Sequence, residues 1–297
     1  MHAPPFHQTR GTLWLVAGTG EGPPLAELLL RAGWRVHVSV VTAAAARAYA
    51  PHPALELTVG SIGGDTSDDG LEARALNGVL AELARAAATS GTYRWVIDAT
   101  HPFASRISAA LAQGCACAGV RLLRLERPAL AGGQVRLLAD LDALGALGRQ
   151  EAPPERLLLA IGARRLAEAV PLLQRGVPKA ILHARILPHA GALQQALAAG
   201  LAPERLACLR PSGEAEAEAA IERALCRRWG IDTVLCRSSG GPTEAHWRRI
   251  ASELGLTLLL LERPAEPCGV ESLPLAELLQ RLEAEVMPAS ESLPKDQ

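Results

Sequence analysis

The sequence of 297 residues lacks several features that would place it in a function class at once. No apolar run reaches the roughly 18 residues needed to span a membrane, and the opening MHAPPFHQTRG lacks the apolar centre of a signal peptide. We therefore expect a cytoplasmic protein with no membrane partner. The six cysteines include no CxxC pair of the kind that holds zinc, so we interpret them as core thiols and predict no metal site.

Lysine is also scarce, because Lys179 and Lys295 are the only two in the chain. Nearly all of the positive charge is therefore arginine, and the formal net charge of −1 argues against a nucleic-acid partner. A codon bias that also enriches alanine and leucine explains most of this scarcity. The positions of the arginines are therefore more informative than their number.

What the chain does have is a large apolar fraction, with 49% hydrophobic and 21% charged residues, which suits a globular protein of about two domains. Short apolar runs alternate with amphipathic segments, the pattern of βαβ units. This predicts the α/β class, with two Rossmann-like domains that each contain an open, mainly parallel sheet of about five strands flanked by helices. The expected strands are Thr12–Ala17, Arg35–Val41, Ala54–Val59, Tyr93–Asp98, Val120–Leu125, Arg156–Ile161, Ala180–Ala184, Arg205–Leu209, Thr233–Cys236 and Thr257–Leu261. The expected helices are Pro23–Ala32, Ala43–Ala50, Leu71–Ala88, Phe103–Ala118, Arg164–Gln174, Ala190–Ala199, Glu214–Trp229, Glu244–Leu254 and Leu275–Val286.

The domain boundary is expected where PALAGGQ, residues 128–134, breaks the alternating pattern. This gives an N-terminal, cofactor-side domain over residues 11–130 and a C-terminal domain over residues 131–287, although the stretch up to Pro154 fits either half. Residues 1–10 and 288–297 are expected to be disordered tails.

Ligands of open parallel sheets bind beyond the carboxyl ends of the strands, so the residues that follow each strand are the candidates. Gly18-Thr19-Gly20-Glu21-Gly22-Pro23 follows the first strand and resembles a phosphate-binding turn, because glycines let the backbone approach a phosphate at a helix N-terminus. The match to G-x-G-x-x-G is imperfect, since Pro23 stands at the third glycine position. A plain β–α turn explains the segment equally well.

The end of the second strand, VSVVT, carries no Asp or Glu to hold a ribose 2′-hydroxyl. Ser39, Thr42 and Arg47 are available instead, so NADPH fits this site better than NADH. A solvated position on a helix is the alternative role for Arg47. After the third strand, the stretch GSIGG supplies Gly63 and Gly64 as further candidates.

Polar residues also follow the fourth strand, in the stretch WVIDATHPFA. Asp98 ends an apolar run, so its carboxylate must be hydrogen-bonded if it is buried. Pro102 suits the first position of a helix, which makes Thr100 or His101 the expected cap. Capping needs one polar residue and this turn has three, so we predict that the turn faces a ligand.

Together these segments resemble the precorrin-6A reductase family of corrin-ring biosynthesis. The resemblance runs from Leu13 to Pro264 and rests on GTGEG, GSIGG, DATHPFASRIS, RLLRLERP, IGARRL, CRSSGG and LLLLERP, in that order. It implies two Rossmann-like domains with NADPH between them, and hydride transfer to a ring double bond of a tetrapyrrole, precorrin-6A or its cobalt-containing form. The chain departs from the family where Arg237 and Trp247 replace common lysines, and at Pro211-Ser212-Gly213.

The resemblance also implies roles for individual residues. The catalytic candidates are Asp98, Thr100 and His101, with His101 as a possible proton donor, although a conjugated ring can also take its proton from water. The cofactor-binding candidates are Gly18, Thr19, Gly20, Glu21, Ser39, Thr42, Arg47, Gly63, Gly64, Pro102, Ser238, Ser239 and Gly240. Because arginine pairs with the carboxylates that a corrin precursor carries, the substrate-binding candidates are mainly arginines at strand ends. They are Arg106, Arg124, Arg127, Gly162, Arg164, His183, Arg185 and Arg237, with Arg165 beside them.

Two other functions fit the same architecture. One is a non-catalytic nucleotide-binding or regulatory protein with two α/β domains, and the other is a sugar-nucleotide enzyme with two Rossmann-like domains. The sequence does not distinguish a cobalt-containing from a metal-free substrate. It gives no oligomeric state and is compatible with a monomer.

Overall fold

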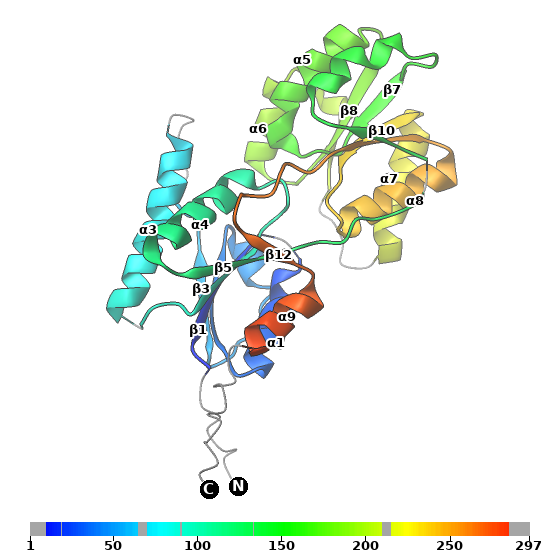
Figure 1. Cartoon of the computed structure of the whole chain (residues 1–297). Helices are drawn as coiled ribbons and strands as arrows, with labels where there is room; N and C mark the ends of the chain where they lie inside the picture. The colour runs from blue at the N-terminus through cyan, green and yellow to red at the C-terminus, as the bar shows by residue number, and fades with distance from the viewer. Residues whose placement is uncertain are drawn as a thin grey trace, which may run out of the picture. The chain divides into compact units, whose positions relative to one another are not determined.

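The computed structural model describes residues 10–18, 20–64, 70–89, 91–132, 134–209 and 215–284. Thr19 and Pro211-Ser212-Gly213 lie outside these ranges, as do the expected tails apart from Arg10. The described residues form two compact units. The first unit is Met1–Glu126 together with Pro264–Gln297, and the second unit is Arg127–Arg263. Both units can be followed by colour in Figure 1.

The first unit is built on a parallel sheet with strand order β12-β5-β4-β1-β2-β3, six strands among the described residues. The chain starts in the middle of this sheet, runs to one edge and then crosses back to the other side of β1. The strands are β1 (Thr12–Ala17), β2 (Arg35–Val40), β3 (Leu55–Val59), β4 (Trp95–Ala99), β5 (Arg121–Leu125) and β12 (Glu271–Leu273).

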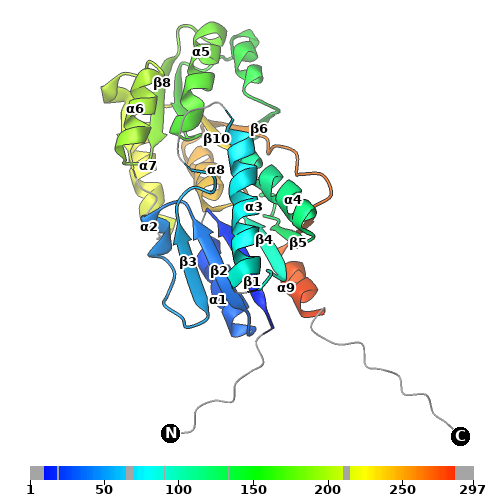
Figure 2. The same ribbon diagram turned by 90° about the vertical axis from the view of Figure 1, so that its left-hand side faces the viewer.

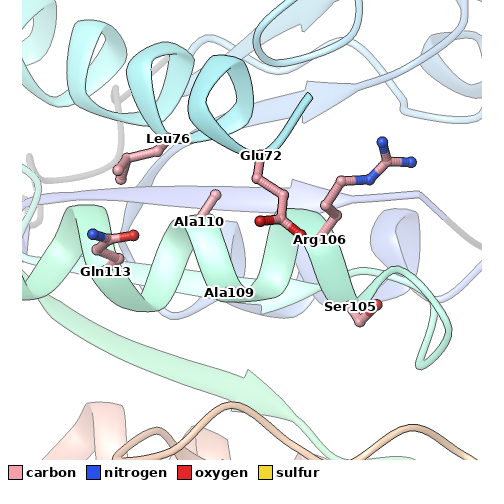
Figure 3. A pocket seen from close by; sticks show the side chains of 7 residues that line it. All are labelled: Glu72, Leu76, Ser105, Arg106, Ala109, Ala110 and Gln113. Carbon is pink, nitrogen blue, oxygen red and sulfur yellow. The ribbon is translucent and has the colours of Figure 1, made fainter. Parts of the chain in front are cut away.

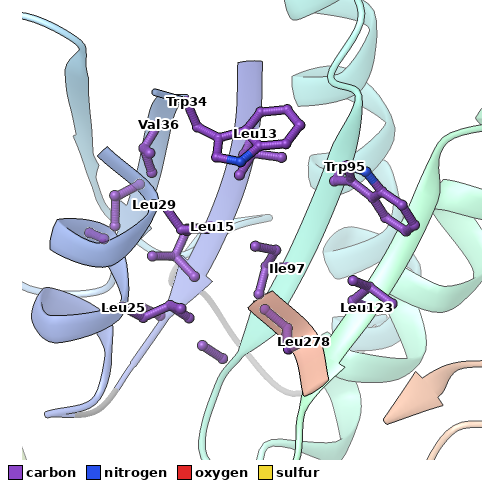
Figure 4. Close-up of a cluster of buried hydrophobic side chains, with 14 of the residues drawn as sticks. Leu13, Leu15, Leu25, Leu29, Trp34, Val36, Trp95, Ile97, Leu123 and Leu278 are labelled. Atoms are coloured by element: carbon purple, nitrogen blue, oxygen red, sulfur yellow. The ribbon is translucent and has the colours of Figure 1, made fainter. Parts of the chain in front are cut away.

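Helices cover both faces of this first sheet, as the turned view in Figure 2 shows. They are α1 (Gly22–Arg31), α2 (Ala43–Ala46), α3 (Leu71–Thr89), α4 (Ser105–Ala118) and α9 (Leu275–Ala284). On one face, Leu25 and Leu29 of α1 and Leu278 of α9 pack with apolar strand residues such as Ile97 (Figure 4). On the other face, apolar residues of α3 and α4 pack around Trp14 and Val96. Both faces are thus dry, which agrees with the nearly continuous apolar runs of the central strands.

The second unit repeats this plan, with strand order β6-β11-β10-β7-β8-β9 and again six parallel strands in the described part of the chain. The strands are β6 (Val135–Leu138), β7 (Arg156–Leu159), β8 (Ile181–Ile186), β9 (Leu206–Cys208), β10 (Thr233–Arg237) and β11 (Thr257–Leu261). The α-helices are α5 (Leu166–Gly176), α6 (Ala190–Ala198), α7 (Ala215–Trp229) and α8 (Pro242–Leu254). Short 3₁₀ helices are η1 (Asp142–Arg149), η2 (Ala163–Arg165) and η3 (Pro203–Arg205). Helices α7 and α8 pack on one face of the sheet, and Figure 1 shows α5 and α6 on the other.

The predicted α/β class and the two parallel sheets are confirmed, but each sheet has one strand that the pattern did not predict. These strands are β6 and β12, both at sheet edges. Four and three residues are too few to display a clear periodicity, and β12 follows the irregular stretch after Pro264.

The C-terminal segment also differs from the expected division, which assigned residues 131–287 to one domain. Strand β12 pairs with β5, and α9 buries Leu278 and Leu282 in the first unit. The segment from Pro264 onward therefore completes the first unit, because its amphipathic helix covers an apolar face of that sheet. Among the described residues, no helix is long and apolar enough to cross a membrane.

Candidate functional site

The first unit has its topological switch point at β1 and β4. These neighbouring strands are paired in register, with Ala17 opposite Ala99, while the chain continues from β1 to β2 on the other side. The turn at Gly18 and the turn that starts at Thr100 therefore leave the sheet edge side by side. This is the place where open α/β sheets bind ligands, so two predicted segments are brought together here.

Within the glycine turn, Gly22 is the residue packed closely against neighbouring atoms. A Cβ atom on Gly22 would lie 2.1 Å from the Tyr49 hydroxyl oxygen and 2.7 Å from the Ala17 Cβ atom. Gly22 thus permits close contact between α1 and β1, the role that the third glycine of a dinucleotide-binding turn has. Pro23 is therefore compatible with this turn, since it lies in the first turn of α1, where proline is tolerated.

Gly18 and Gly20, in contrast to Gly22, are not crowded by described atoms. Both are exposed, and a Cβ atom on either would meet no described atom within 4 Å. Within the described part of the chain, no atom occupies the space that a side chain at either position would need. Glu21, also a cofactor candidate, is the N-cap residue of α1 and is half-buried.

The candidates for a 2′-phosphate differ in accessibility. Ser39 is buried, with 7% of its surface exposed, and its hydroxyl oxygen accepts a hydrogen bond from the Trp14 indole at 2.9 Å. Thr42 caps α2, accepting from the Ala45 N–H at 3.2 Å, and Arg47 is exposed at the C-terminus of the same helix. Thr42 and Arg47 remain accessible, whereas Ser39 belongs to the interior.

Gly63 and Gly64 follow β3 with φ angles of +92° and +82°. A Cβ atom on Gly63 would lie 2.4 Å from the main-chain oxygen of Arg74, so this glycine packs against the start of α3. Gly64 is exposed, and a Cβ atom there would meet no described atom within 4 Å. The requirement for glycine at position 63 therefore comes from the fold itself.

The polar turn after β4 is anchored by a buried ion pair. Asp98, which is 1% exposed, accepts a hydrogen bond from the Thr100 N–H at 2.9 Å, and its other carboxylate oxygen pairs with Arg124 on β5. Arg124 is 3% exposed, donates to the Ser108 hydroxyl at 2.6 Å and also pairs with Glu266. Asp98 and Arg124 thus lie opposite each other in register and support the turn from inside the sheet. Both side chains thus have partners inside the first unit, and their predicted contact with a ligand stays a prediction.

Thr100 and His101 do not cap the following helix. Helix α4 begins at Ser105 with Ala104 as its N-cap, two residues later than predicted, and Pro102 lies in the turn before it. His101 is half-buried and its Nδ1 atom accepts a hydrogen bond from the Phe103 N–H at 3.1 Å. In the neutral ring this places the proton on Nε2, so Nε2 is the atom able to donate. Thr100 is nearly buried, with its hydroxyl 3.3 Å from that of Ser108.

The second unit has its own switch point, at β7 and β10. Leu159 lies opposite Leu235 in register, and the Ala160 N–H donates to the Leu235 oxygen at 2.8 Å. The turn with Gly162 and the turn of Ser238-Ser239-Gly240 therefore begin side by side, as predicted from the positions of these motifs after strands. Gly162 has φ +88° and ψ 150°, a backbone conformation that is essentially restricted to glycine.

Arginines gather at this second switch point. Burial lowers the pKa of the Arg237 guanidinium, and the positive charges of Arg165 and Arg127 lower it further. The charges of Arg127 and Arg165 thus act on Arg237 at the edge of the second sheet, and a group of positive charges of this kind favours binding of an anion. Arg164 is exposed on the adjoining 3₁₀ helix.

Three other substrate candidates lie elsewhere. His183 is 4% exposed in the interior of β8, where its ring stacks on Trp229 at 4.6 Å, and Arg185 pairs with Glu222 at 3.3 Å. His183 is thus buried against Trp229, and its predicted role in substrate binding stays a prediction. Arg106 lines a groove of about 280 Å³ between α3 and α4, into which Glu72 and Gln113 also project (Figure 3).

Sequence reasoning missed a second buried carboxylate. Glu244 of α8 is 1% exposed, accepts from the Gly240 N–H at 2.8 Å and pairs with Arg248 at 2.8 Å. The signal for it was present, because Gly241 is the N-cap and Glu244 is three residues later, the spacing of a capping box. Among the described residues, no group of three or more His, Cys, Asp or Glu could hold a metal ion.

Comparison with known proteins places this geometry in a family. The family described as "Precorrin-6x reductase CbiJ/CobK" matches residues 12–283. The chain belongs to this family. The cobalt-precorrin-6A reductase of Synechocystis sp. is 31% identical over 258 residues, which are 85% of this chain and 88% of that protein. The precorrin-6A reductase of Mycobacterium tuberculosis is 30% identical over 258 residues, 86% of this chain and 90% of that protein. A solved structure named CobK precorrin-6A reductase has a TM-score of 0.67 and 26% identity, covering 92% of this chain and 97% of the other.

Proposed function

We propose that the chain is an NADPH-dependent reductase that acts on a ring double bond of precorrin-6A or cobalt-precorrin-6A. Membership of the CbiJ/CobK family and the names of its relatives support the reaction class and the tetrapyrrole substrate. Bound NADPH would supply the hydride. The chain's own residues would bind and orient the cofactor and the substrate and exclude water from them.

The observation that carries the cofactor proposal is the free space at Gly18 and Gly20. Gly63 and Gly22 are required by contacts within the fold, whereas no described atom crowds a side chain at positions 18 and 20. A ligand whose phosphates approach the main chain would explain glycine at these two positions. Glu21 is the N-cap of α1, so the start of this helix supplies an N-terminus at the same turn. Thr19, which lies outside the described residues, stays a predicted cofactor residue.

Selectivity for NADPH over NADH rests on the end of β2. Val40, Val41 and Thr42 include no carboxylate that would hold a 2′-hydroxyl, and both Thr42 and Arg47 are exposed. A guanidinium suits a 2′-phosphate, because it offers a fixed fork of donors. Ser238, Ser239 and Gly240 of the second unit remain candidate cofactor ligands.

The substrate's carboxylates are assigned to the arginine group of the second unit. The positive charges of Arg165 and Arg127 lower the pKa of Arg237, so a bound anion would relieve the repulsion that acts on Arg237. In the first unit, His101 would offer its Nε2 proton, while Asp98 and Arg124 hold the main chain of that turn. Because a conjugated ring spreads the charge that it receives, we expect His101→Ala to lower kcat only modestly. A loss of about 1,000-fold on folded protein would instead identify a general acid.

The decisive experiment is an anaerobic assay with precorrin-6A and cobalt-precorrin-6A, each with NADPH and with NADH, followed by loss of the substrate's visible absorption. Gly18→Ala should raise the Kd of NADPH about tenfold or more at an unchanged Tm, because its methyl group occupies only the ligand's space. Gly145→Ala is the matched control, because a Cβ atom there would also meet no described atom within 4 Å. Wild-type affinity in Gly18→Ala would show that this turn does not contact the cofactor.

Arg47→Ala sharpens the same experiment. It should weaken NADPH binding much more than NADH binding if Arg47 meets the 2′-phosphate. An unchanged ratio of the two dissociation constants would make Arg47 an ordinary surface residue. Equal binding of NADPH and NADH by the wild-type protein would overturn the NADPH assignment.

A further inference from the structure

Arg263 follows β11 and directs its guanidinium entirely at main-chain oxygens. Nε donates to the Ser238 oxygen at 2.9 Å, Nη1 to the Arg127 oxygen at 2.7 Å and Nη2 to the Pro128 oxygen at 2.8 Å. One side chain thus joins the turn after β10 to the segment that follows β5. No role was assigned to this residue from the sequence.

Arg127 takes part in the same arrangement. Its side chain is 7% exposed and its Nη1 atom lies 3.5 Å from the Ser239 oxygen. Two successive carbonyl groups of the turn, those of Ser238 and Ser239, are therefore each held by an arginine.

The turn approaches these groups so closely that only glycine fits at position 240. Gly240 has φ +66°, and a Cβ atom there would lie 2.2 Å from the Pro128 oxygen and 2.4 Å from Arg263 Nη2. Glycine at this position is therefore required by its left-handed backbone and by the close approach of the Pro128 carbonyl, which Arg263 also binds. The turn, the segment at Pro128 and the guanidinium form one packed group within the second unit.

The sequence repeats the tripeptide Glu-Arg-Pro at the two places that bring these groups together. Glu126-Arg127-Pro128 follows β5, and Glu262-Arg263-Pro264 follows β11. The chain passes between the two units within these tripeptides, since the second unit begins at Arg127 and ends at Arg263. The two arginines of the repeat end on neighbouring carbonyls of one turn.

We infer that Arg263 is a positioning residue, which fixes the main chain of Ser238-Ser239-Gly240 for ligand binding without touching the ligand. Its effect on catalysis rests on the proposed function, in which this turn contacts the cofactor. Reactions that transfer a hydride depend on placement to within a fraction of an ångström, so a loosened turn lowers the rate even when the fold persists.

The geometry requires arginine and not merely a positive charge. Three carbonyls are bound by three different nitrogen atoms of one planar group, which the compact ammonium of lysine cannot reproduce. Arg263→Lys and Arg263→Met should therefore behave alike. If Arg263 instead bound an anion through its charge, Arg263→Lys would retain most of the activity.

The test measures hydrogen exchange first and kinetics second, on wild type, Arg263→Met, Arg263→Lys and Gly240→Ala. In ligand-free protein the Ser238 and Gly240 N–H groups are bonded to the Leu261 oxygen and to Glu244. Exchange in a peptide covering residues 237–245 should become about tenfold faster in all three variants. The kcat/KM for NADPH should fall at least about tenfold for protein that remains folded.

Arg223→Met is the matched control, because Arg223 pairs with Glu253 at 2.6 Å in the same unit and lies outside the proposed site. It should change neither the exchange of residues 237–245 nor kcat/KM. Unchanged exchange in Arg263→Met, wild-type kinetics in its folded fraction, or rescue by Arg263→Lys would each overturn the inference. If wild type neither binds NADPH nor reduces either substrate, the proposed function fails, while the exchange data still decide whether Arg263 positions the turn. Should Arg263→Met not fold, Arg263→Lys and Gly240→Ala decide the outcome.

Discussion

The two switch points of this protein are held by the same device in two different settings. In the first unit, Asp98 accepts from the Thr100 N–H and pairs with Arg124. In the second unit, Glu244 accepts from the Gly240 N–H and pairs with Arg248. In each case a carboxylate that is 1% exposed fixes the turn after a central strand, and an arginine compensates its charge.

The settings differ in burial and in where the arginine comes from. Arg124 lies on the neighbouring strand with a side chain that is 4% exposed, so both charges of the pair are removed from water. Arg248 comes from the same helix as Glu244, is 15% exposed and also donates to the Gly132 oxygen at 2.6 Å. The first turn thus depends on one dry pair between strands. The second turn is held both by Glu244 at the start of α8 and by the arginines that bind the Ser238 and Ser239 oxygens.

Removing the dry pair should have the largest effect on stability. Asp98→Ala leaves Arg124 buried with only part of its compensation, which should lower the free energy of unfolding by about 3–5 kcal/mol. Urea unfolding of wild type and variant measures it. Arg31→Ala removes an exposed pair with Glu27 in the same unit, and this control should change stability by less than about 1 kcal/mol. Equal effects of the two substitutions would contradict the importance of the dry pair.

The corresponding substitution in the second unit should be milder. Glu244→Ala removes one acceptor from the Gly240 N–H and one partner from Arg248, which keeps the Gly132 oxygen and part of its access to water. We expect a loss of about 1.5–3 kcal/mol in the same unfolding measurement. Glu253→Ala, whose partner Arg223 is also partly exposed, is the control and should cost under about 1 kcal/mol. A loss as large as that of Asp98→Ala would remove the distinction between the two turns.

The sequence predicted the strands that carry these turns because the central strands are apolar on both faces and end in glycine or polar residues. It could not predict β12, since three residues carry no periodicity and their partner β5 lies far away in the sequence. The same remoteness explains the C-terminal segment, whose return to the first unit depends on tertiary packing of α9.

The candidate site shows a similar limit. Position after a strand predicted that the turns of Gly18, Gly162 and Ser238 lie at the sheet edges, because connectivity alone brings them there. It could not predict which of the candidate side chains are buried, as Arg124 and His183 are. The burial of Arg124 depends on strand register, because Arg124 lies opposite Asp98 on the neighbouring strand.

Close packing of helix on strand offers a third contrast, between Gly22 and Gly18 of the same turn. Gly22→Ala forces a methyl group against the Tyr49 hydroxyl and Ala17, so α1 must shift. The free energy of unfolding should fall by about 1–3 kcal/mol, measured by urea unfolding. Gly18→Ala should leave it unchanged, since nothing described lies within 4 Å. Similar losses for both would mean that Gly18 is also required by the fold.

Each unit also buries one histidine in its sheet, and their surroundings differ. His37 is 2% exposed, with Nδ1 2.5 Å from the Tyr93 hydroxyl and Nε2 2.8 Å from the Thr58 hydroxyl. Burial lowers the pKa of His37, while Glu82 and Glu56 oppose the change. Burial also lowers the pKa of His183, and Arg205 and Arg156 lower it further. Burial thus disfavours the protonated form of both histidines, but nearby carboxylates stabilise that form only at His37.

The smallest expected effect is therefore a difference in acid sensitivity. A histidine whose folded pKa lies below its unfolded value of 6.5 binds its proton more readily after unfolding, so stability falls as the pH drops from 6.5 towards the folded pKa. One such group contributes at most about 1.4 kcal/mol per pH unit. His183→Gln should flatten the decline of Tm between about pH 6.5 and 5 more than His37→Gln does, because His183 has positive neighbours in place of carboxylates. Thermal melts at several pH values, each compared with the same variant at pH 8, separate this slope from the constant cost of the substitution. An equal or smaller flattening for His183→Gln would show that the carboxylates near His37 do not relieve its charge.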